Sequence, residues 1–257
     1  MQPMKRIQGN IVARQERRFL NWACSVMPEQ VSSDHLTAFG VFGAVLVVVG
    51  YVAGRSNVDF LWLAALGYVI HWFGDSLDGS LARYRNVSRP RYGYFLDHSL
   101  DVFCIVLMVG GMGLSSFARM DVAMYVVVAY LILAIHVFLK NHVTGTFQLS
   151  FIALGPTELR MVFVAITVWM IIQGGDSYHL ALPGVSGYDI ALLVTGTVLF
   201  TLFIVNSVTM VLHLRALEGD GRRPLPAIEP ARAAGARQAS DIARDRRSAS
   251  VQESSAY

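Results

Sequence analysis

Long apolar segments dominate this chain and restrict what it can fold into. Six of them follow one another at residues 36–52, 58–73, 93–112, 122–138, 159–173 and 190–212. Most are long enough to cross a bilayer whose hydrocarbon core is about 30 Å thick. Only 15% of the residues are charged, whereas soluble domains carry roughly 25%. The sequence therefore predicts an all-α integral membrane protein with six transmembrane helices.

Both ends of the chain differ from this apolar middle. Residues 4–27 combine apolar and basic side chains at helical spacing, which is typical of an amphipathic helix on an anionic membrane surface, although an ordinary solvated helix can share it. From about residue 218 the chain has too few large apolar residues to offset the entropy of ordering. We therefore expect an interfacial N-terminal helix in 1–33, a transmembrane domain in 34–216 and a disordered tail in 217–257.

The positions of Lys and Arg predict an orientation in the membrane. All but two of the 21 basic residues lie near the chain ends, between spans two and three, or between spans four and five; the two exceptions are Arg55 and Arg119. Basic segments remain on the cytoplasmic side of a membrane. We therefore expect an integral protein of the cell or inner membrane with the active site and both termini in the cytoplasm. Six spans agree with this, because an even number returns the chain to its starting side.

Four carboxylates lie between the second and third spans. The stretch DSLDGSLARYRNVSRPRYGYFLDHSLD contains two pairs at helical spacing, each beside a glycine: Asp75, Asp78, Asp97 and Asp101. Acids at membrane depth are costly and usually face a polar cavity, a partner or an ion. Both pairs lie at the cytoplasmic ends of their predicted helices. We therefore expect a functional site there.

The chemistry of such a site follows from its oxygen atoms. Facing carboxylates repel one another unless they are protonated or bridged by cations. Their hard oxygen atoms suit Mg²⁺, Mn²⁺ or Ca²⁺, and neither Cys nor His occurs here at a convincing zinc spacing. Two divalent cations in an acidic cup are a known arrangement for phosphoryl chemistry. Arg83, directly after the first pair, could hold a phosphate.

The spacing of this stretch also matches a family signature. Asp75-x-x-Asp78-Gly79-x-x-Ala82-Arg83, followed by Gly93-x-x-x-Asp97-x-x-x-Asp101, resembles the motif of the CDP-alcohol phosphotransferases, also called CDP-alcohol phosphatidyltransferases. Every fixed position is present, and the interval between Arg83 and Gly93 is one residue longer than usual. The resemblance implies an enzyme of phospholipid biosynthesis that moves a phosphatidyl or other phospho-alcohol group from CDP-diacylglycerol, or a similar CDP-alcohol, to a hydroxyl acceptor and releases CMP.

The resemblance also assigns roles by position. It implies that two divalent cations, Mg²⁺ or Mn²⁺, are bound mainly by Asp75, Asp78 and Asp97. Asp101 is the expected general base and is close enough to share in metal ligation. The residues expected to hold the CDP moiety are Asp78, Gly79, Ala82, Arg83 and Gly93. The expected partners are a CDP-linked lipid donor, a hydroxyl acceptor, membrane lipid and a second copy of the chain, with no nucleic acid.

Polar residues near the span ends are secondary candidates. By resemblance, Asp34 and Thr37 lie near the nucleotide, although Ser33 or Asp34 could simply cap the first span. Glu158 or Arg160 could touch the acceptor, although Pro156 and Glu158 are also ordinary signals of a helix start.

Residues beside the acidic pairs have two interpretations each. His98 could orient the neighbouring Asp97 or point elsewhere. Arg85, Arg89 and Arg91 could bind a phosphate on the acceptor or the lipid donor, or could serve only as cytoplasmic anchors.

Two other functions are compatible with parts of the pattern. Transfer from CDP-choline or CDP-ethanolamine to diacylglycerol is one, because Asp97-His98-x-x-Asp101 is similar to that branch of the family. A divalent-cation transporter is the other, but its acids are expected near mid-membrane in broken helices. Here the acids lie at helix ends beside the fixed charge of Arg83, which disfavours a cation pathway.

Overall fold

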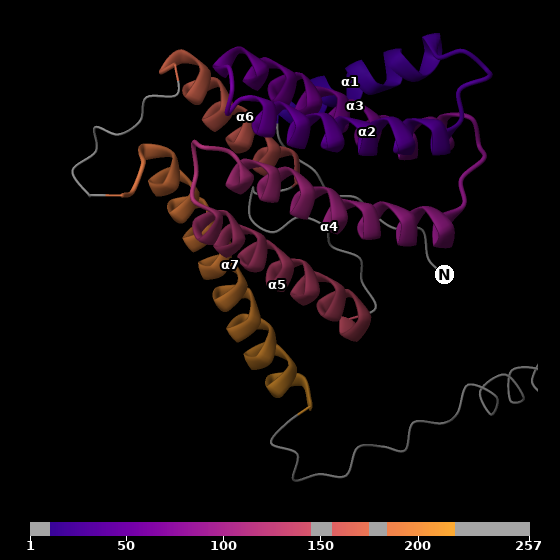
Figure 1. Cartoon of the computed structure of the whole chain (residues 1–257). Coiled ribbons are helices and arrows are strands. Elements are labelled where there is room, and N and C mark those ends of the chain that lie inside the picture. Colours follow the sequence, from indigo (N-terminus) through magenta and orange to yellow (C-terminus); the bar gives the residue numbers. More distant parts are fainter. Residues whose placement is uncertain (1–10, 145–155, 175–183, 219–257) are drawn as a thin grey trace, which may run out of the picture. The chain divides into compact units, whose positions relative to one another are not determined.

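The computed structural model describes residues 11–144, 156–174 and 184–218, and every regular element among them is helical (Figure 1). The predicted all-α fold is therefore confirmed. One short 3₁₀ turn, Val58–Phe60, precedes α3. The α-helices are α1 (Ile11–Val26), α2 (Ser33–Ala53), α3 (Leu61–Tyr84), α4 (Pro90–Leu114), α5 (Met120–Thr144), α6 (Pro156–Ile172) and α7 (Gly187–Glu218).

Five of these helices are long and apolar enough to cross a membrane: α2, α3 with its 3₁₀ turn, α4, α5 and α7. The sixth predicted span corresponds to α6, a shorter helix of 17 residues. Length and composition thus support five of the six predicted spans. Residues 4–10 of the predicted amphipathic helix and the tail from residue 219 lie outside the described residues, and the interfacial position of α1 stays a prediction.

Internal contacts divide the chain into two units, residues 1–207 and 208–257. The boundary falls inside α7, so the first unit holds α1 to α6 and the larger part of α7. The described part of the second unit is the remainder of α7, up to Glu218. The predicted divisions after residues 33 and 216 stay predictions. All the residues discussed below as a site belong to the first unit.

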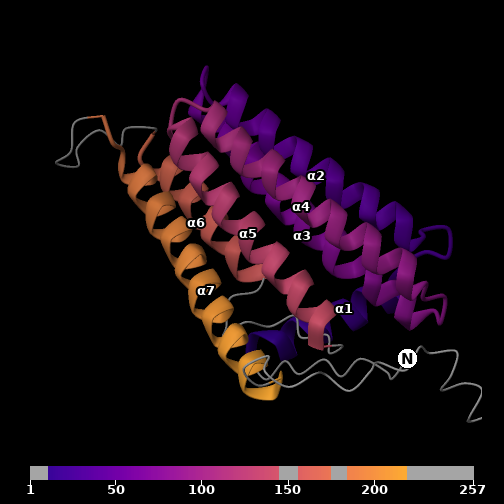
Figure 2. The same ribbon diagram turned by 90° about the horizontal axis from the view of Figure 1, so that it is seen from below.

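Glycines allow α2 and α3 to run side by side (Figure 2). A Cβ atom on Gly43 would meet the backbone nitrogen of His71 at 2.5 Å, and one on Gly74 would meet the backbone nitrogen of Gly40 at 2.5 Å. Only a residue without a side chain permits such an approach between helices. The close contact fixes how the acidic end of α3 lies against the start of α2.

Three further helices pack against this pair. α4 contacts α2, whereas α6 and α1 contact α3, and α5 packs on α4. The core between α2, α3 and α6 holds the fully buried side chains of Tyr51, Tyr68 and Phe163, and the Tyr51 and Thr167 hydroxyls lie 2.6 Å apart. Burying these large side chains excludes water from the bundle. The polar site described next lies at the edge of this core.

The start of α2 differs from one expectation. Ser32 is the N-cap, and its hydroxyl accepts a hydrogen bond from the backbone nitrogen of His35 at 3.2 Å. The expectation that Ser33 or Asp34 caps this helix was therefore wrong. Ser33 is instead directed to α3, where its hydroxyl donates to the backbone oxygen of Asp78 at 2.9 Å.

Arg85, at the end of α3, holds the segment between α1 and α2. Its guanidinium donates hydrogen bonds to the backbone oxygens of Met27, Pro28 and Val31 at 3.0, 2.8 and 2.6 Å. These carbonyls follow the end of α1, where no helical partner is available to them. Arg85 is thus a structural clamp between helices, and its role as a cytoplasmic anchor stays a prediction.

Candidate active site

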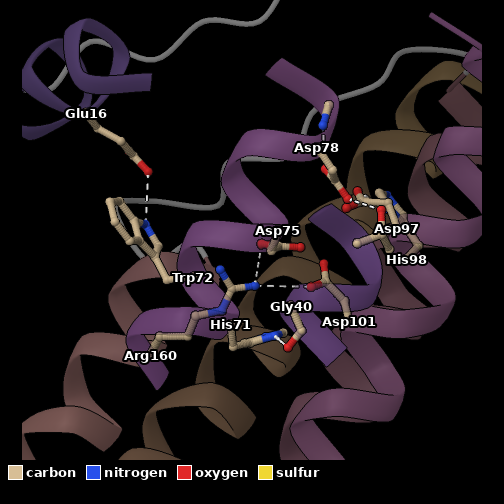
Figure 3. Close-up of polar contacts among 12 residues, drawn as sticks. Glu16, Gly40, His71, Trp72, Asp75, Asp78, Asp97, His98, Asp101 and Arg160 are labelled. Atoms are coloured by element: carbon tan, nitrogen blue, oxygen red, sulfur yellow. Dashed lines mark hydrogen bonds and ion pairs between the residues drawn. The ribbon is translucent and has the colours of Figure 1, made fainter. Parts of the chain in front are cut away.

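The acidic pairs meet where the second half of α3 faces the first half of α4 (Figure 3). Asp75 and Asp101 lie near the middle of their helices, so the expectation that both pairs lie at helix ends was wrong; α3 continues to Tyr84, and α4 begins already at Pro90. One carboxylate oxygen from each of Asp75, Asp97 and Asp101 lies within 4.8 Å of the others. We call this group, together with Asp78, the acidic cup. The pocket around it is lined by Thr37, Gly40, Val41, His71, Asp75, Asp78, Asp97, Leu100, Asp101 and Cys104. The predicted meeting of the two pairs is therefore seen in the fold.

The geometry of the cup suits a divalent cation. Mg²⁺ and Ca²⁺ bind oxygen ligands at about 2.0–2.6 Å, so two ligands on opposite sides of one ion are about 4–5 Å apart. The 4.8 Å limit for Asp75, Asp97 and Asp101 falls within that range. The pocket volume of about 10 Å³ is of the size of one water or ion. The residues present thus fit a hard cation held by carboxylate oxygens.

Asp78 lies on the α2 side of the cup and is held there by hydrogen bonds. The hydroxyl of Thr37 donates to its Oδ2 atom at 2.6 Å, and the backbone nitrogen of Gly79 donates to Oδ1. Asp78 lines the pocket but falls outside the group of three close oxygens. Its role as a metal ligand stays a prediction, whereas the predicted proximity of Thr37 to the site is found.

Asp34 and Arg89 pair with each other at the edge of this region. Asp34 belongs to the first turn of α2, and Arg89 is the N-cap residue of α4. The Arg89 guanidinium also lies 4.2 Å from the ring centre of Tyr92. The pair joins the starts of two helices and is about half exposed, so it is accessible to a charged ligand. Arg91 is exposed in the first turn of α4, and its predicted role is untested.

Arg160 enters the acidic cup from α6. Its Nη2 atom lies 2.6 Å from Oδ2 of Asp75 and 3.2 Å from Oδ1 of Asp101, and its side chain is 7% exposed (Figure 3). The sequence placed Arg160 near the cavity as an alternative to Glu158 but gave it no partner. Glu158 lies half-buried two residues earlier on the same helix, and its contact with an acceptor stays a prediction.

Two histidines lie against the cup. Nδ1 of His98 is 3.1 Å from Oδ2 of Asp97, and the ring packs between Tyr94 and Phe138. The contact matches the predicted orienting role. His71 was missed by the sequence analysis, although it precedes Asp75 by one helical turn; its Nδ1 atom is 3.0 Å from the backbone oxygen of Gly40, and it lines the pocket.

The glycines of the acidic stretch differ from those between α2 and α3. A Cβ on Gly93 would meet nothing within 4 Å, and one on Gly79 would meet only the guanidinium of Arg83, at 3.1 Å. Arg83 itself donates to the hydroxyl of Ser80 at 3.2 Å, and Ala82 beside it is half-buried. Packing therefore does not explain these two glycines, which leave space beside the carboxylates.

A known protein family matches the part of the chain that contains the acidic cup. A protein-family model described as CDP-alcohol phosphatidyltransferase matches residues 31–217. The matched segment runs from just before α2 almost to the end of α7 and includes all four aspartates of the cup. No curated protein sequence matches the chain.

Proposed function

The chain belongs to the CDP-alcohol phosphatidyltransferase family, and on that premise we propose that it transfers a phosphatidyl group from CDP-diacylglycerol to a hydroxyl acceptor and releases CMP. The family supports phosphatidyl transfer from a CDP-alcohol in lipid synthesis as the general activity. The choice of CDP-diacylglycerol as donor is our own proposal. The observation that carries the proposed transfer is the cluster of Asp75, Asp97 and Asp101 oxygens on facing segments of α3 and α4.

The proposed reaction forms one bond to phosphorus and breaks another. The acceptor oxygen attacks the phosphorus that carries the diacylglycerol, and the bond from that phosphorus to the CMP oxygen breaks. Divalent cations, when bound by Asp75, Asp78 and Asp97, would offset the negative charge of the pyrophosphate and of the departing CMP. Asp101 takes the proton of the acceptor hydroxyl as the attack proceeds.

The residues around the cup support donor binding at this position. The open space above Gly93 gives a nucleotide room to approach the carboxylates, and beside Gly79 the nearest neighbour is the flexible guanidinium of Arg83. The guanidinium of Arg83 follows on the same helix and can pair with a phosphate. Thr37 holds Asp78 from α2, so the side of the cup nearest these glycines is pre-positioned for binding.

The orientation and assembly of the enzyme follow from the earlier predictions. We infer that the cup opens toward the cytoplasm, since the basic segment between α3 and α4 stays on that side. A CDP-linked donor presents its water-soluble nucleotide there while its acyl chains remain in lipid. A homodimer is the arrangement implied by the family, and its test is the mass of the purified protein in detergent.

CMP release tests the proposal directly. Purified protein receives CDP-diacylglycerol, Mg²⁺ or Mn²⁺, and in turn glycerol 3-phosphate, inositol, inositol phosphate, serine, choline or phosphatidylglycerol. We expect CMP release with one acceptor and its loss in Asp75→Ala and Asp101→Asn, the latter with donor binding retained. Asp121→Ala is the matched control, because Asp121 pairs with Arg119 at the start of α5.

Two results would contradict the proposal. Release only from CDP-choline or CDP-ethanolamine with diacylglycerol would make the chain an amino-alcohol transferase. Normal turnover in Asp101→Asn would remove Asp101 from the role of general base.

A further inference from the structure

Arg160 is a buried positive charge among the cup's carboxylates. A single nitrogen, Nη2, contacts both Asp75 and Asp101, at 2.6 and 3.2 Å. The side chains of these aspartates are 23% and 20% exposed, and that of Arg160 is 7% exposed. Solvent therefore screens the contact weakly, and removing one member of such a group leaves an uncompensated buried charge.

The guanidinium and a metal ion would use the same two carboxylates. Asp75 and Asp101 provide two of the three close oxygens that could hold a cation. A divalent cation lies about 2.0–2.6 Å from its carboxylate ligands, which is close to the distances at which Nη2 lies from these residues. Two positive groups so near each other repel strongly where water is scarce, so each weakens the binding of the other to these carboxylates.

We propose that Arg160 is an internal counter-ion that occupies the cup before metal binding and competes with a divalent cation for Asp75 and Asp101. The inference rests on the proposed function, because it takes the cup as a cation site. In the metal-free protein the guanidinium keeps two like charges together on α3 and α4. Metal binding then displaces it, and the affinity for the cation is lowered by the free energy of breaking its two ion pairs.

A second small pocket borders both Arg160 and Asp101. Its lining includes His71, Met108 and Tyr130. Its volume of about 10 Å³ is that of one water, so a guanidinium that leaves Asp75 requires these side chains to move aside.

Mn²⁺ binding by the purified full-length protein tests this competition without requiring turnover. The signal of free Mn²⁺ in electron paramagnetic resonance gives the dissociation constant for wild type, Arg160→Met and Arg160→Lys. We expect Arg160→Met to bind Mn²⁺ at least tenfold more tightly than wild type, since the competing charge is gone and the side-chain volume is nearly kept. Arg119→Met is the matched control, because Arg119 also pairs with an aspartate but lies outside the cup; we expect its affinity for Mn²⁺ to be unchanged.

Thermal unfolding supplies a second readout. Without Mn²⁺, Arg160→Met should unfold at a lower temperature than wild type, because Asp75 and Asp101 then repel each other without a counter-ion. Saturating Mn²⁺ should restore most of that loss. If Arg160→Met does not fold, Arg160→Lys provides the test. The lysine ammonium pairs with two carboxylates less effectively than the planar guanidinium does, so this variant should bind Mn²⁺ a few-fold more tightly than wild type.

Equal or weaker Mn²⁺ binding in the folded variant would overturn this inference alone, because Arg160 would then support the metal site. Wild-type protein that binds no Mn²⁺, and that releases no CMP, would overturn the proposed function as well. The two failures are therefore distinguishable.

Discussion

Gly74→Ala tests whether close packing of α2 and α3 builds the site. The added Cβ would lie 2.5 Å from the backbone nitrogen of Gly40 and 2.5 Å from the backbone oxygen of Leu36, whereas ordinary contacts begin near 3.4 Å. The helices must therefore separate by about 1 Å at this point. Backbone atoms cannot move aside as side chains do, so the cost should lie in the upper part of the range of about 1–3 kcal/mol for overpacking.

The helical preference of alanine offsets part of that cost. Alanine is favoured over glycine inside a helix by about 0.5–1 kcal/mol. We therefore expect Gly74→Ala to lower the free energy of unfolding by about 2 kcal/mol. The separation should also lengthen the 2.6 Å hydrogen bond from Thr37 to Asp78, and so reduce turnover in the protein that remains folded.

Gly93→Ala is the matched control, because the same substitution on α4 meets nothing within 4 Å. We expect it to leave stability unchanged or to raise it by about 0.5–1 kcal/mol, while weakening binding of the CDP donor. Equilibrium unfolding in mixed micelles of mild detergent and SDS, followed by tryptophan fluorescence, measures both variants. Equal stability of Gly74→Ala and wild type would refute the packing argument.

Two further substitutions probe single contacts. Thr37→Val removes the hydroxyl that donates to Asp78, and we expect about 10–100-fold weaker Mn²⁺ binding. Thr37→Ser keeps the hydroxyl and should bind Mn²⁺ as wild type does. Equal affinity of the two variants would mean that Asp78 does not need this hydrogen bond. Arg85→Ala should loosen α1, whose Cys24 is buried against α3. Burial raises the pKa of the Cys24 thiol and so keeps it unreactive. If the substitution lowers the free energy that holds α1 in place by about 1.5 kcal/mol, maleimide should label Cys24 about tenfold faster. The buried Cys104 of α4 should remain unlabelled in the same sample, and an unchanged Cys24 rate would show that Arg85 does not hold α1.

Local spacing was enough to predict that the two acidic pairs come together. Asp75 and Asp78 share a helix face, as do Asp97 and Asp101, and the short turn between α3 and α4 brings the second half of α3 beside the first half of α4. The same local reasoning could have found His71, because it precedes Asp75 by one turn on that face. It was missed because a single histidine in an apolar run has no distinctive spacing.

Contacts between distant segments could not be predicted in this way. Arg160 is separated from Asp101 by 59 positions, and helical periodicity does not say which face of α6 turns to α3. Arg85 was an ambiguous cation until the fold placed three carbonyl oxygens within its reach. The cap of α2 was misplaced by one or two residues, because Ser32, Ser33 and Asp34 are all good capping residues and only the fold directs Ser33 to Asp78.

The sequence by itself determined the class of fold, the family signature and the four carboxylates, since apolar length and helical period are properties of neighbouring residues. Only the tertiary structure decided which charge lies among those carboxylates and which glycines serve packing. Gly74 and Gly93 are chemically identical in the sequence, yet one lies against the backbone of α2 and the other in open space. The physical reason is that burial and ion pairing depend on which helix faces meet, and that is settled by the packing of the whole bundle.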